Sequence, residues 1–460
     1  MSDETVISII PKRIEFLVIA KNAELLSVAN DVAEHYDFRS ETCATVEDIP
    51  LDTRTESSPL MTLIELDSDS TIQERMRILG LLREIFPRTQ VVVVVEGGET
   101  VEDCDFMRGA GAHHMILFQE IRGSAKLYYL SALIIQGTYL PVPVTDLFPS
   151  TQVTFNAYHK LSLNQKFLPV LFSGFTFSDK KYRKLESAKQ IYIRRENLEE
   201  YRKYIETYHD STGAALKKRC RATMMTLMGL YSELMLLLLL DSEVAKKEVL
   251  SAKIEEFIVT AQELAGYLNN CPDVWNVIAQ ALDFKFCRYE RAIYILAYAL
   301  QIAQKAQLLT DTRTLIVTTL LADIGLMDLP AVHYKNILTK PESQLDANDL
   351  EKLKSHPMGS LNRVMFRNLD VSQDVKSCIV CTHERNDQQG FPNQVPPDKI
   401  PMEAKLILFS ELMDRRVRAT LEDGIITHDF VRKQVWEEEK VSLKRFNAEF
   451  LDKIEKVLIA

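Results

Sequence analysis

The sequence predicts a multi-domain protein in which a parallel α/β sheet domain comes first, a small β-rich module follows, and an all-α helical bundle ends the chain. Apolar strand patterns alternate with helical spacing over residues 12–140, short strand patterns separated by Pro, Gly and Ser fill residues 140–210, and helical spacing dominates after residue 273. A chain of 460 residues is also too long for one ordinary core. We expect domains at residues 1–138, 139–210, 211–270 (a helical connector) and 271–460.

The composition is that of a soluble globular protein, with 46% hydrophobic and 26% charged residues. The net charge of −10 argues against broad nucleic-acid binding, so no nucleic-acid partner is expected. The first ten residues lack a long apolar core, and the most apolar run, Met235–Leu240, is far shorter than the ~20 residues of a membrane span. Seven cysteines cannot form a complete disulfide framework. These features predict a reduced, cytoplasmic setting without a membrane span.

The first domain alternates strands with helices. Continuous apolar runs such as Gln90–Val95 are typical of strands buried on both faces, and helices supply the crossovers that parallel strands need. The expected strands are Ile14–Ala20, Leu60–Leu66, Gln90–Val95 and His114–Phe118, and the expected helices are Ala23–Tyr36, Thr71–Phe86 and Val101–Gly109.

The segment Phe106–Leu117 resembles the stretch before the last strand in the receiver domains of two-component response regulators. That family ends its first strand with an acidic pair that binds magnesium and its third strand with the aspartate that accepts phosphate. Here Ala20 and Lys21 stand at the acidic positions and Glu65 at the degenerate phosphoacceptor position. Because phosphoryl transfer to a carboxylate needs a divalent cation, the resemblance implies a pseudo-receiver used for dimerisation or partner docking. Lys21 could pair with Glu65, or the domain could be purely structural.

The middle module combines short strands with a local positive charge. Residues 156–204 hold eleven Lys or Arg against five Asp or Glu, so the module could hold an anionic ligand or an acidic partner surface; a solvated face is the alternative. Two long helices are expected over Gly213–Leu268, and their apolar excess suits a bundle interior or an oligomer seam. A homodimer is a possible assembly. The strands are expected at Val142–Leu147, Val153–His159, Phe167–Phe172 and Gln190–Ile193.

The last region has the pattern of a helical bundle, and four motifs follow one another along it. They are Leu321-Ala322-Asp323-Ile324-Gly325, Lys354-Ser355-His356-Pro357, Thr382-His383-Glu384-Arg385 followed by Gly390-Phe391-Pro392, and Ser410-Glu411-Leu412-Met413-Asp414. The expected helices are Trp275–Leu282, Tyr289–Ala306, Asp311–Ile324, Ala347–Leu353, His356–Phe366, Ser372–Thr382, Pro401–Arg418 and Asp429–Ile459.

In this order and spacing the motifs resemble the HD-GYP family, HD-domain phosphohydrolases that hydrolyse cyclic di-GMP with two or three metal ions. The resemblance covers roughly residues 270–460 and implies which ligand positions remain. Asp323, His356 and His383 persist, and Glu411 stands for an aspartate. At the other family positions the resemblance implies losses: Cys287 stands for a glutamate and Leu326 for a lysine. Arg291, Ala322 and Thr382 stand for histidines.

The losses predict that no bimetallic centre forms. A cationic Arg291 would repel metal and could replace it by pairing with Asp323 or Glu411. No cofactor is expected, although Asp323, His356, His383 and Glu411 could hold a single divalent metal; the alternative is that these four are satisfied polar residues of the bundle.

The resemblances together imply a bacterial signalling pseudoenzyme that acts by protein interaction or by nucleotide sensing rather than hydrolysis. Gly390, Phe391 and Pro392 would form an interaction loop, and Arg385 would contact nucleotide. The expected partners are other signalling proteins, such as cyclic di-GMP synthase-type domains, and cyclic di-GMP itself. The alternative is an active cyclic di-GMP phosphodiesterase with an unorthodox metal site.

Overall fold

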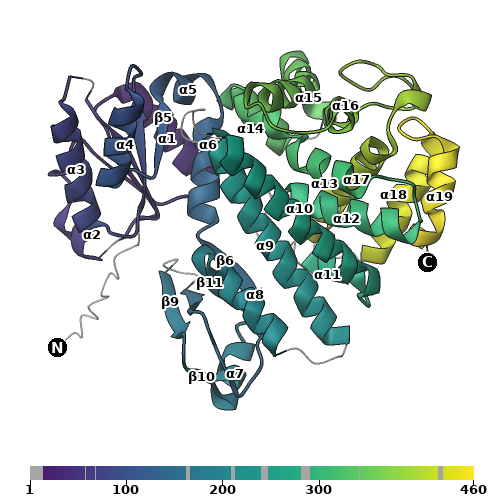
Figure 1. Ribbon diagram of the computed structural model, residues 1–460, viewed down its shortest axis with the longest axis horizontal. Coiled ribbons are helices and arrows are strands. Elements are labelled where there is room, and N and C mark those ends of the chain that lie inside the picture. Colours follow the sequence, from purple (N-terminus) through teal and green to yellow (C-terminus); the bar gives the residue numbers. More distant parts are fainter. Residues whose placement is uncertain are drawn as a thin grey trace, which may run out of the picture. The chain divides into compact units, whose positions relative to one another are not determined.

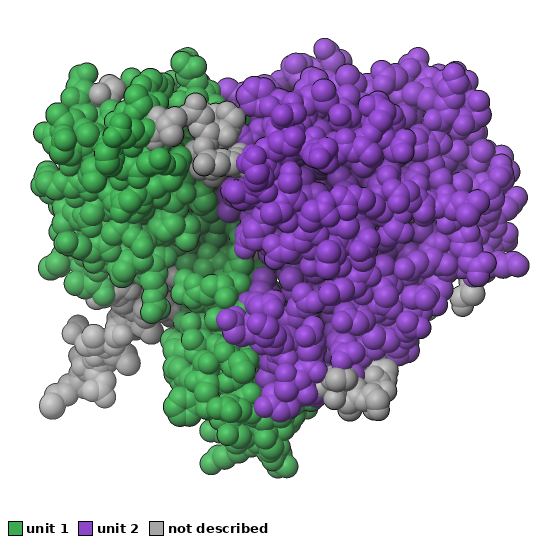
Figure 2. All heavy atoms as spheres, viewed as in Figure 1, with its two compact units in different colours: residues 1–122, 126–197 green, residues 123–125, 198–460 purple. Residues whose placement is uncertain are grey.

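The computed structural model describes residues 14–56, 58–67, 69–161, 166–208, 213–239, 247–280, 291–340, 342–422 and 428–459. The chain forms two compact units, shown in two colours in Figure 2. Unit 1 comprises residues 1–122 and 126–197, and unit 2 comprises residues 123–125 and 198–460. The division into four domains expected from the sequence remains a prediction.

Unit 1 begins with a five-stranded sheet of order β2-β1-β3-β4-β5, in which all pairs are parallel. The expected parallel α/β domain is confirmed, and four of its strands lie where the apolar runs placed them. Figure 1 labels its helices and the strand β5. The strands are β1 (Phe16–Ile19), β2 (Ser40–Cys43), β3 (Met61–Glu65), β4 (Gln90–Val95) and β5 (His114–Leu117); the helices are α1 (Ala23–Tyr36), α2 (Leu51–Glu56), α3 (Ile72–Ile85), α4 (Val101–Ala110) and α5 (Phe118–Gly123).

Local sequence signals fix the helix starts in this domain. Thr71 and Glu74 form a reciprocal capping box at α3, and Thr100 and Asp103 do the same at α4. The edge strand β2 was not predicted, because its SETC sequence lacks an apolar run and its side chains are exposed or half-buried.

The rest of unit 1 is the expected β-rich module. Its main sheet is antiparallel with the order β6-β11-β8-β9, and β7 pairs with β10. The strand predicted at Val142–Leu147 ends early, because a 3₁₀ turn occupies Val144–Asp146. The elements are α6 (Lys126–Ser131), a π-helical turn (Ala132–Gln136), β6 (Tyr139–Pro143), β7 (Thr151–Gln152), β8 (Ala157–Leu161), β9 (Lys166–Leu171), β10 (Thr176–Phe177), α7 (Asp179–Glu186) and β11 (Gln190–Arg194).

Unit 2 opens with α8 (Leu198–Thr207) and the two long helices expected from the sequence, α9 (Gly213–Leu239) and α10 (Lys247–Asn270). Within α9, residues Ala214–Leu239 are long and apolar enough to cross a membrane, a longer stretch than the run Met235–Leu240. However, 78% of its most apolar window is buried, as in the core helix of a soluble domain.

The remainder of unit 2 is a helical bundle, as predicted. Several features differ from expectation: one helix, α15, spans the segment expected to break before His356, and two helices replace the one expected over Asp429–Ile459. The helix expected over Asp311–Ile324 ends at Leu321, and the helix at Ala331–Thr339 was not expected. The elements are α11 (Val274–Gln280), α12 (Arg291–Lys305), α13 (Thr312–Leu321), the 3₁₀ turn η5 (Ile324–Asp328), α14 (Ala331–Thr339), α15 (Ala347–Phe366), α16 (Gln373–Cys381), α17 (Met402–Glu422), α18 (His428–Ser442) and α19 (Ala448–Ile459).

Candidate metal centre

Three of the four side chains expected as possible metal ligands form one cluster. Asp323 follows α13, His356 lies in α15 and His383 follows α16. One ligand atom of each lies within 4.8 Å of the others, a spacing that could hold a metal ion. Both histidines are buried, and Asp323 is half-buried.

The proline in α15 orients His356. Pro357 has no N–H, so the carbonyl of Leu353, four residues earlier, lacks its helical donor. His356 Nδ1 instead donates to that carbonyl at 2.5 Å. A carbonyl can only accept, so Nδ1 carries a proton, and in the neutral form of the ring Nε2 carries the lone pair. Nε2 faces Asp323 Oδ1 at 3.4 Å and is a buried atom without a hydrogen-bond partner, which is the state of an available metal ligand.

The contact between η5 and α15 sets the distance from Asp323 to His356. The Gly325 N–H donates to Ser360 Oγ at 2.8 Å, and that hydroxyl donates to the Ala322 carbonyl at 2.5 Å. A Cβ on Gly325 would stand 2.3 Å from the His356 carbonyl oxygen, so only glycine allows this approach.

The loop after α16 packs against His383. The ring of Phe391 stacks on the His383 ring with centroids 4.9 Å apart, and His356 meets His383 edge-on at 4.8 Å. Glu384 is buried and accepts the N–H groups of Asn393 and Val395 at 2.7 and 3.0 Å. This carboxylate therefore shapes the loop that covers the histidine.

A guanidinium group, that of Arg291, lies beside the cluster and pairs with two carboxylates of α17. Arg291 Nη2 lies 3.3 Å from Glu411 Oε1, and Arg291 Nε lies 3.1 Å from Asp414 Oδ2. Arg415 Nη2 also bonds Glu411 Oε1, at 2.6 Å. The expected pairing of Arg291 with Glu411 is present. The Asp414 contact was missed, although its position three residues after Glu411 on one helix face was a usable signal.

The charges around the cluster are mutually stabilised. Burial opposes the charge on Arg291, but the carboxylates of Asp414 and Glu411 outweigh it and raise the pKa of the guanidinium. Burial alone would raise the pKa of Glu411; Arg415, His383 and Arg291 hold it below its usual range instead. Burial lowers the pKa of His383 to about 4, so its ring is neutral at pH 7.

The cluster of Asp323, His356 and His383 is consistent with a single metal ion. Two neutral imidazoles and a carboxylate are a usual three-ligand set, and a cation held there would act as a Lewis acid toward an oxygen ligand. Glu411 Oε1 and Asp414 Oδ2 are bonded to arginines, and the other Glu411 oxygen, Oε2, lies 3.7 Å from His383 Nδ1. Glu411 thus does not join the other three as a free ligand.

The other candidate residues of the bundle have local partners. Arg385 Nη2 bonds Asp387 Oδ2 at 2.6 Å. Gly390 is buried, and Phe391 and Pro392 are half-buried, so this loop packs inward as well as facing solvent. The roles of Arg385 in nucleotide contact and of residues 390–392 in docking stay predictions. Cys287 lies outside the described residues.

At the carboxyl edge of the parallel sheet, Glu65 caps the start of α1. Its Oε2 accepts the main-chain N–H groups of Lys21 and Asn22 at 2.8 and 3.0 Å. The sequence suggested that the Lys21 ammonium would pair with Glu65; the bond comes from its backbone amide instead. A cavity of about 290 Å³ lies beside these residues.

Comparison with known proteins finds a likeness in the helical region. Residues 273–420, within unit 2, match the model of the HD domain family. Among solved structures, the chain is similar to "Bd1817, a HDG"Y"P protein from Bdellovibrio bacteriovorus", with 19% identity and a TM-score of 0.46 over 70% of this chain and 100% of that one. No curated protein matched the sequence.

Proposed function

We propose that this chain is a cytoplasmic bacterial signalling protein of HD-GYP type, a pseudoenzyme whose HD domain holds at most one divalent cation and does not hydrolyse cyclic di-GMP. Arg291 carries the proposal, because its guanidinium bonds both Glu411 and Asp414 beside the cluster of Asp323, His356 and His383. A second cation placed beside this fixed positive charge would be opposed by repulsion.

The N-terminal α/β domain is, in this proposal, a pseudo-receiver that does not accept phosphate. Glu65 is already engaged with the amides of Lys21 and Asn22, and Ala20 and Lys21 offer no carboxylate for magnesium. Incubation of the full chain with acetyl phosphate and Mg²⁺ is expected to leave its mass unchanged. An added phosphoryl group on residues 61–67 would contradict this part of the proposal.

Metal analysis and hydrolysis of cyclic di-GMP test the HD domain together. After loading with Mn²⁺ or Fe²⁺, we expect no more than one ion per chain and no turnover. His356→Ala should lose the ion, while His159→Ala, a substitution in the β-rich module, should keep it. Stoichiometric metal together with turnover would overturn the pseudoenzyme and establish the active phosphodiesterase with an unorthodox metal site.

The output of such a pseudoenzyme would be protein contacts or nucleotide sensing. We propose other signalling proteins as partners, cyclic di-GMP synthase-type domains among them, and a homodimer as one assembly. Sensing predicts saturable cyclic di-GMP binding that weakens in Arg385→Gln but not in Arg416→Gln, whose exposed partner is Glu438. Absence of binding would eliminate sensing and leave protein contacts.

A further inference from the structure

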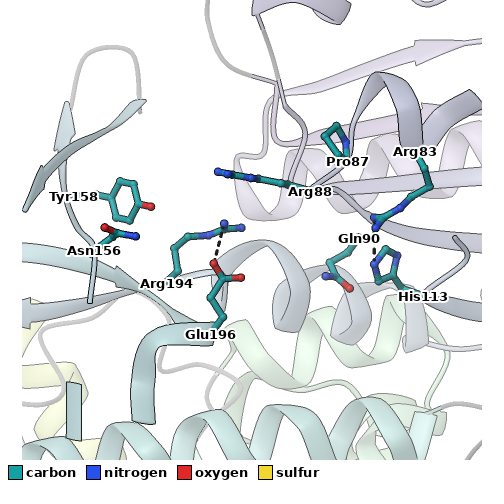
Figure 3. A pocket seen from close by; sticks show the side chains of 9 residues that line it. All are labelled: Arg83, Pro87, Arg88, Gln90, His113, Asn156, Tyr158, Arg194 and Glu196. Atoms are coloured by element: carbon teal, nitrogen blue, oxygen red, sulfur yellow. Dashed lines mark hydrogen bonds and ion pairs between the residues drawn. The ribbon is translucent and has the colours of Figure 1, made fainter. Parts of the chain in front are cut away.

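We propose that unit 1 binds a small organic phosphate in a cavity at the amino edge of its parallel sheet. The cavity has a volume of about 330 Å³ and is lined from both the α/β sheet domain and the β-rich module (Figure 3). The lining side chains that carry the argument are Arg83, Arg88, Gln90, His113, Tyr158 and Arg194. This site is independent of the HD domain and of its proposed function.

The cavity is separate from the degenerate phosphoacceptor position. Gln90 begins β4 and His113 directly precedes β5, so both lie where parallel strands start. Glu65 ends β3 and therefore lies at the opposite, carboxyl edge. A ligand held by Arg88 would not touch Glu65.

Two guanidinium groups converge on the cavity. Arg88 extends from the loop between α3 and β4, Arg194 extends from the end of β11, and Figure 3 shows both pointing into the same space. Arg194 pairs with Glu196 at 3.0 Å, but that carboxylate side chain is 63% exposed, and Arg194 Nε is buried without a hydrogen-bond partner. An anion between the two guanidinium groups would reduce their mutual repulsion and would accept a hydrogen bond from the unpaired Arg194 N–H.

A second pair of donors lines the same cavity. His113 Nδ1 accepts the Val91 N–H at 3.0 Å, so the proton of the neutral ring sits on Nε2. Burial and the nearby Arg83 both lower the pKa of His113, which keeps that ring neutral at pH 7. Nε2 lies 3.5 Å from Arg83 Nη1, so two donors face each other. An oxygen acceptor would satisfy both.

Gly111 makes the placement of Arg83 possible. Its φ is +120°, and a Cβ there would stand 2.3 Å from Arg83 Cγ. The turn before β5 thus requires glycine both for its backbone conformation and for the passage of the arginine side chain. This arrangement holds the guanidinium next to His113.

The chemistry of the lining favours phosphate. Three arginines and one glutamate, Glu196, give a local charge of +2 in a chain of net charge −10. Guanidinium forks approaching from different sides match the several charged oxygens of a phosphate better than the two of a carboxylate. The cavity is larger than one phosphate and is at the lower end of small-molecule sites. The Tyr158 hydroxyl and the Gln90 amide remain to bond the organic part.

Calorimetric titration of the full chain with pyrophosphate, adenosine diphosphate and guanosine diphosphate tests the proposal, with chelator present to exclude metal-bridged binding. We expect one saturable site for at least one diphosphate and a Kd raised about tenfold or more in Arg88→Gln and in Arg194→Gln. Arg183→Gln, which removes an exposed charge from α7 of the same module, should leave the Kd unchanged.

Two further measurements keep this test decisive. The His356→Ala variant carries its substitution in the HD domain, so its Kd for the diphosphates should equal that of the unaltered chain. Arg88 is exposed, so Arg88→Gln is expected to keep its circular dichroism spectrum and thermal unfolding even if Arg194→Gln does not fold. No saturable binding, or binding that Arg88→Gln does not weaken, would overturn the assignment.

Discussion

Gly325 and His356 are in such close contact that no other residue fits at position 325: a Cβ there would meet the His356 carbonyl oxygen at 2.3 Å. Gly325→Ala should therefore push η5 away from α15 and lower the free energy of unfolding by about 2 kcal/mol, as overpacking does. Both tryptophans, Trp275 and Trp436, lie in unit 2, so urea unfolding followed by tryptophan fluorescence measures this change.

Gly266→Ala is the matched control for Gly325→Ala. Gly266 lies inside α10, and a Cβ there would meet no atom within 4 Å. Alanine is the better helix former, so this variant should gain up to about 1 kcal/mol. Equal effects of the two substitutions would show that the contact between Gly325 and His356 does not constrain the fold.

Pro357 should matter for metal affinity more than for stability. In Pro357→Ala a backbone N–H becomes available to bond the Leu353 carbonyl, and His356 Nδ1 loses its acceptor. We expect a stable helix and divalent metal binding weakened about tenfold, the usual cost of losing such an orienting bond. Calorimetric Mn²⁺ titration measures the affinity, and unchanged metal binding in a folded variant would contradict this role of Pro357.

Arg291→Met should destabilise unit 2 by about 3 kcal/mol, because it leaves the carboxylates of Glu411 and Asp414 without this partner. Asp414 is fully buried, so solvent cannot replace the lost charge. Arg416→Met, which removes an exposed pair with Glu438, should cost less than about 1 kcal/mol. Urea unfolding by fluorescence compares them; similar costs would argue against a structural role for Arg291.

The stability of unit 1 should fall as pH is lowered from about 6.5 toward 4. Burial, with a smaller effect of His113, lowers the pKa of His114 to about 4. An unfolded histidine titrates near 6.5, so in this interval the unfolded chain binds the extra proton. His114→Gln should flatten the pH dependence by about 2 kcal/mol, allowing for screening at a half-buried site. Urea unfolding followed by circular dichroism at pH 7 and 4.5 gives this difference.

The main elements of the fold were predictable because their signals are local. The run Gln90–Val95 and the helix Ala23–Tyr36 have the observed bounds, since one is continuously apolar and the other is periodic. Segments stabilised mainly by tertiary contacts were not predictable. The polar strand β2 forms only by pairing with β1, and α15 continues past Pro357 with a side-chain donor satisfying the freed carbonyl.

The candidate site was predictable in its residues more than in its arrangement. Motif order predicted that Asp323, His356 and His383 belong together, and these three lie in one cluster. The resemblance suggested that Arg291 pairs with Asp323 or Glu411, but it could not show which of the two, nor that Arg415 would bond Glu411 as well. The converging Arg88 and Arg194 likewise come from segments whose proximity only the folded chain shows.

The Arg291 side chain is attached to the backbone, whereas a metal ion exchanges with its surroundings. The positive charge that balances Glu411 and Asp414 is therefore present once in every folded chain, whatever the supply of iron or manganese. A chelator can remove a metal ion from the cluster of Asp323, His356 and His383, but it cannot remove the Arg291 side chain. The bundle keeps its internal neutrality in a metal-starved cell, where an assembly held by two ions would lose it.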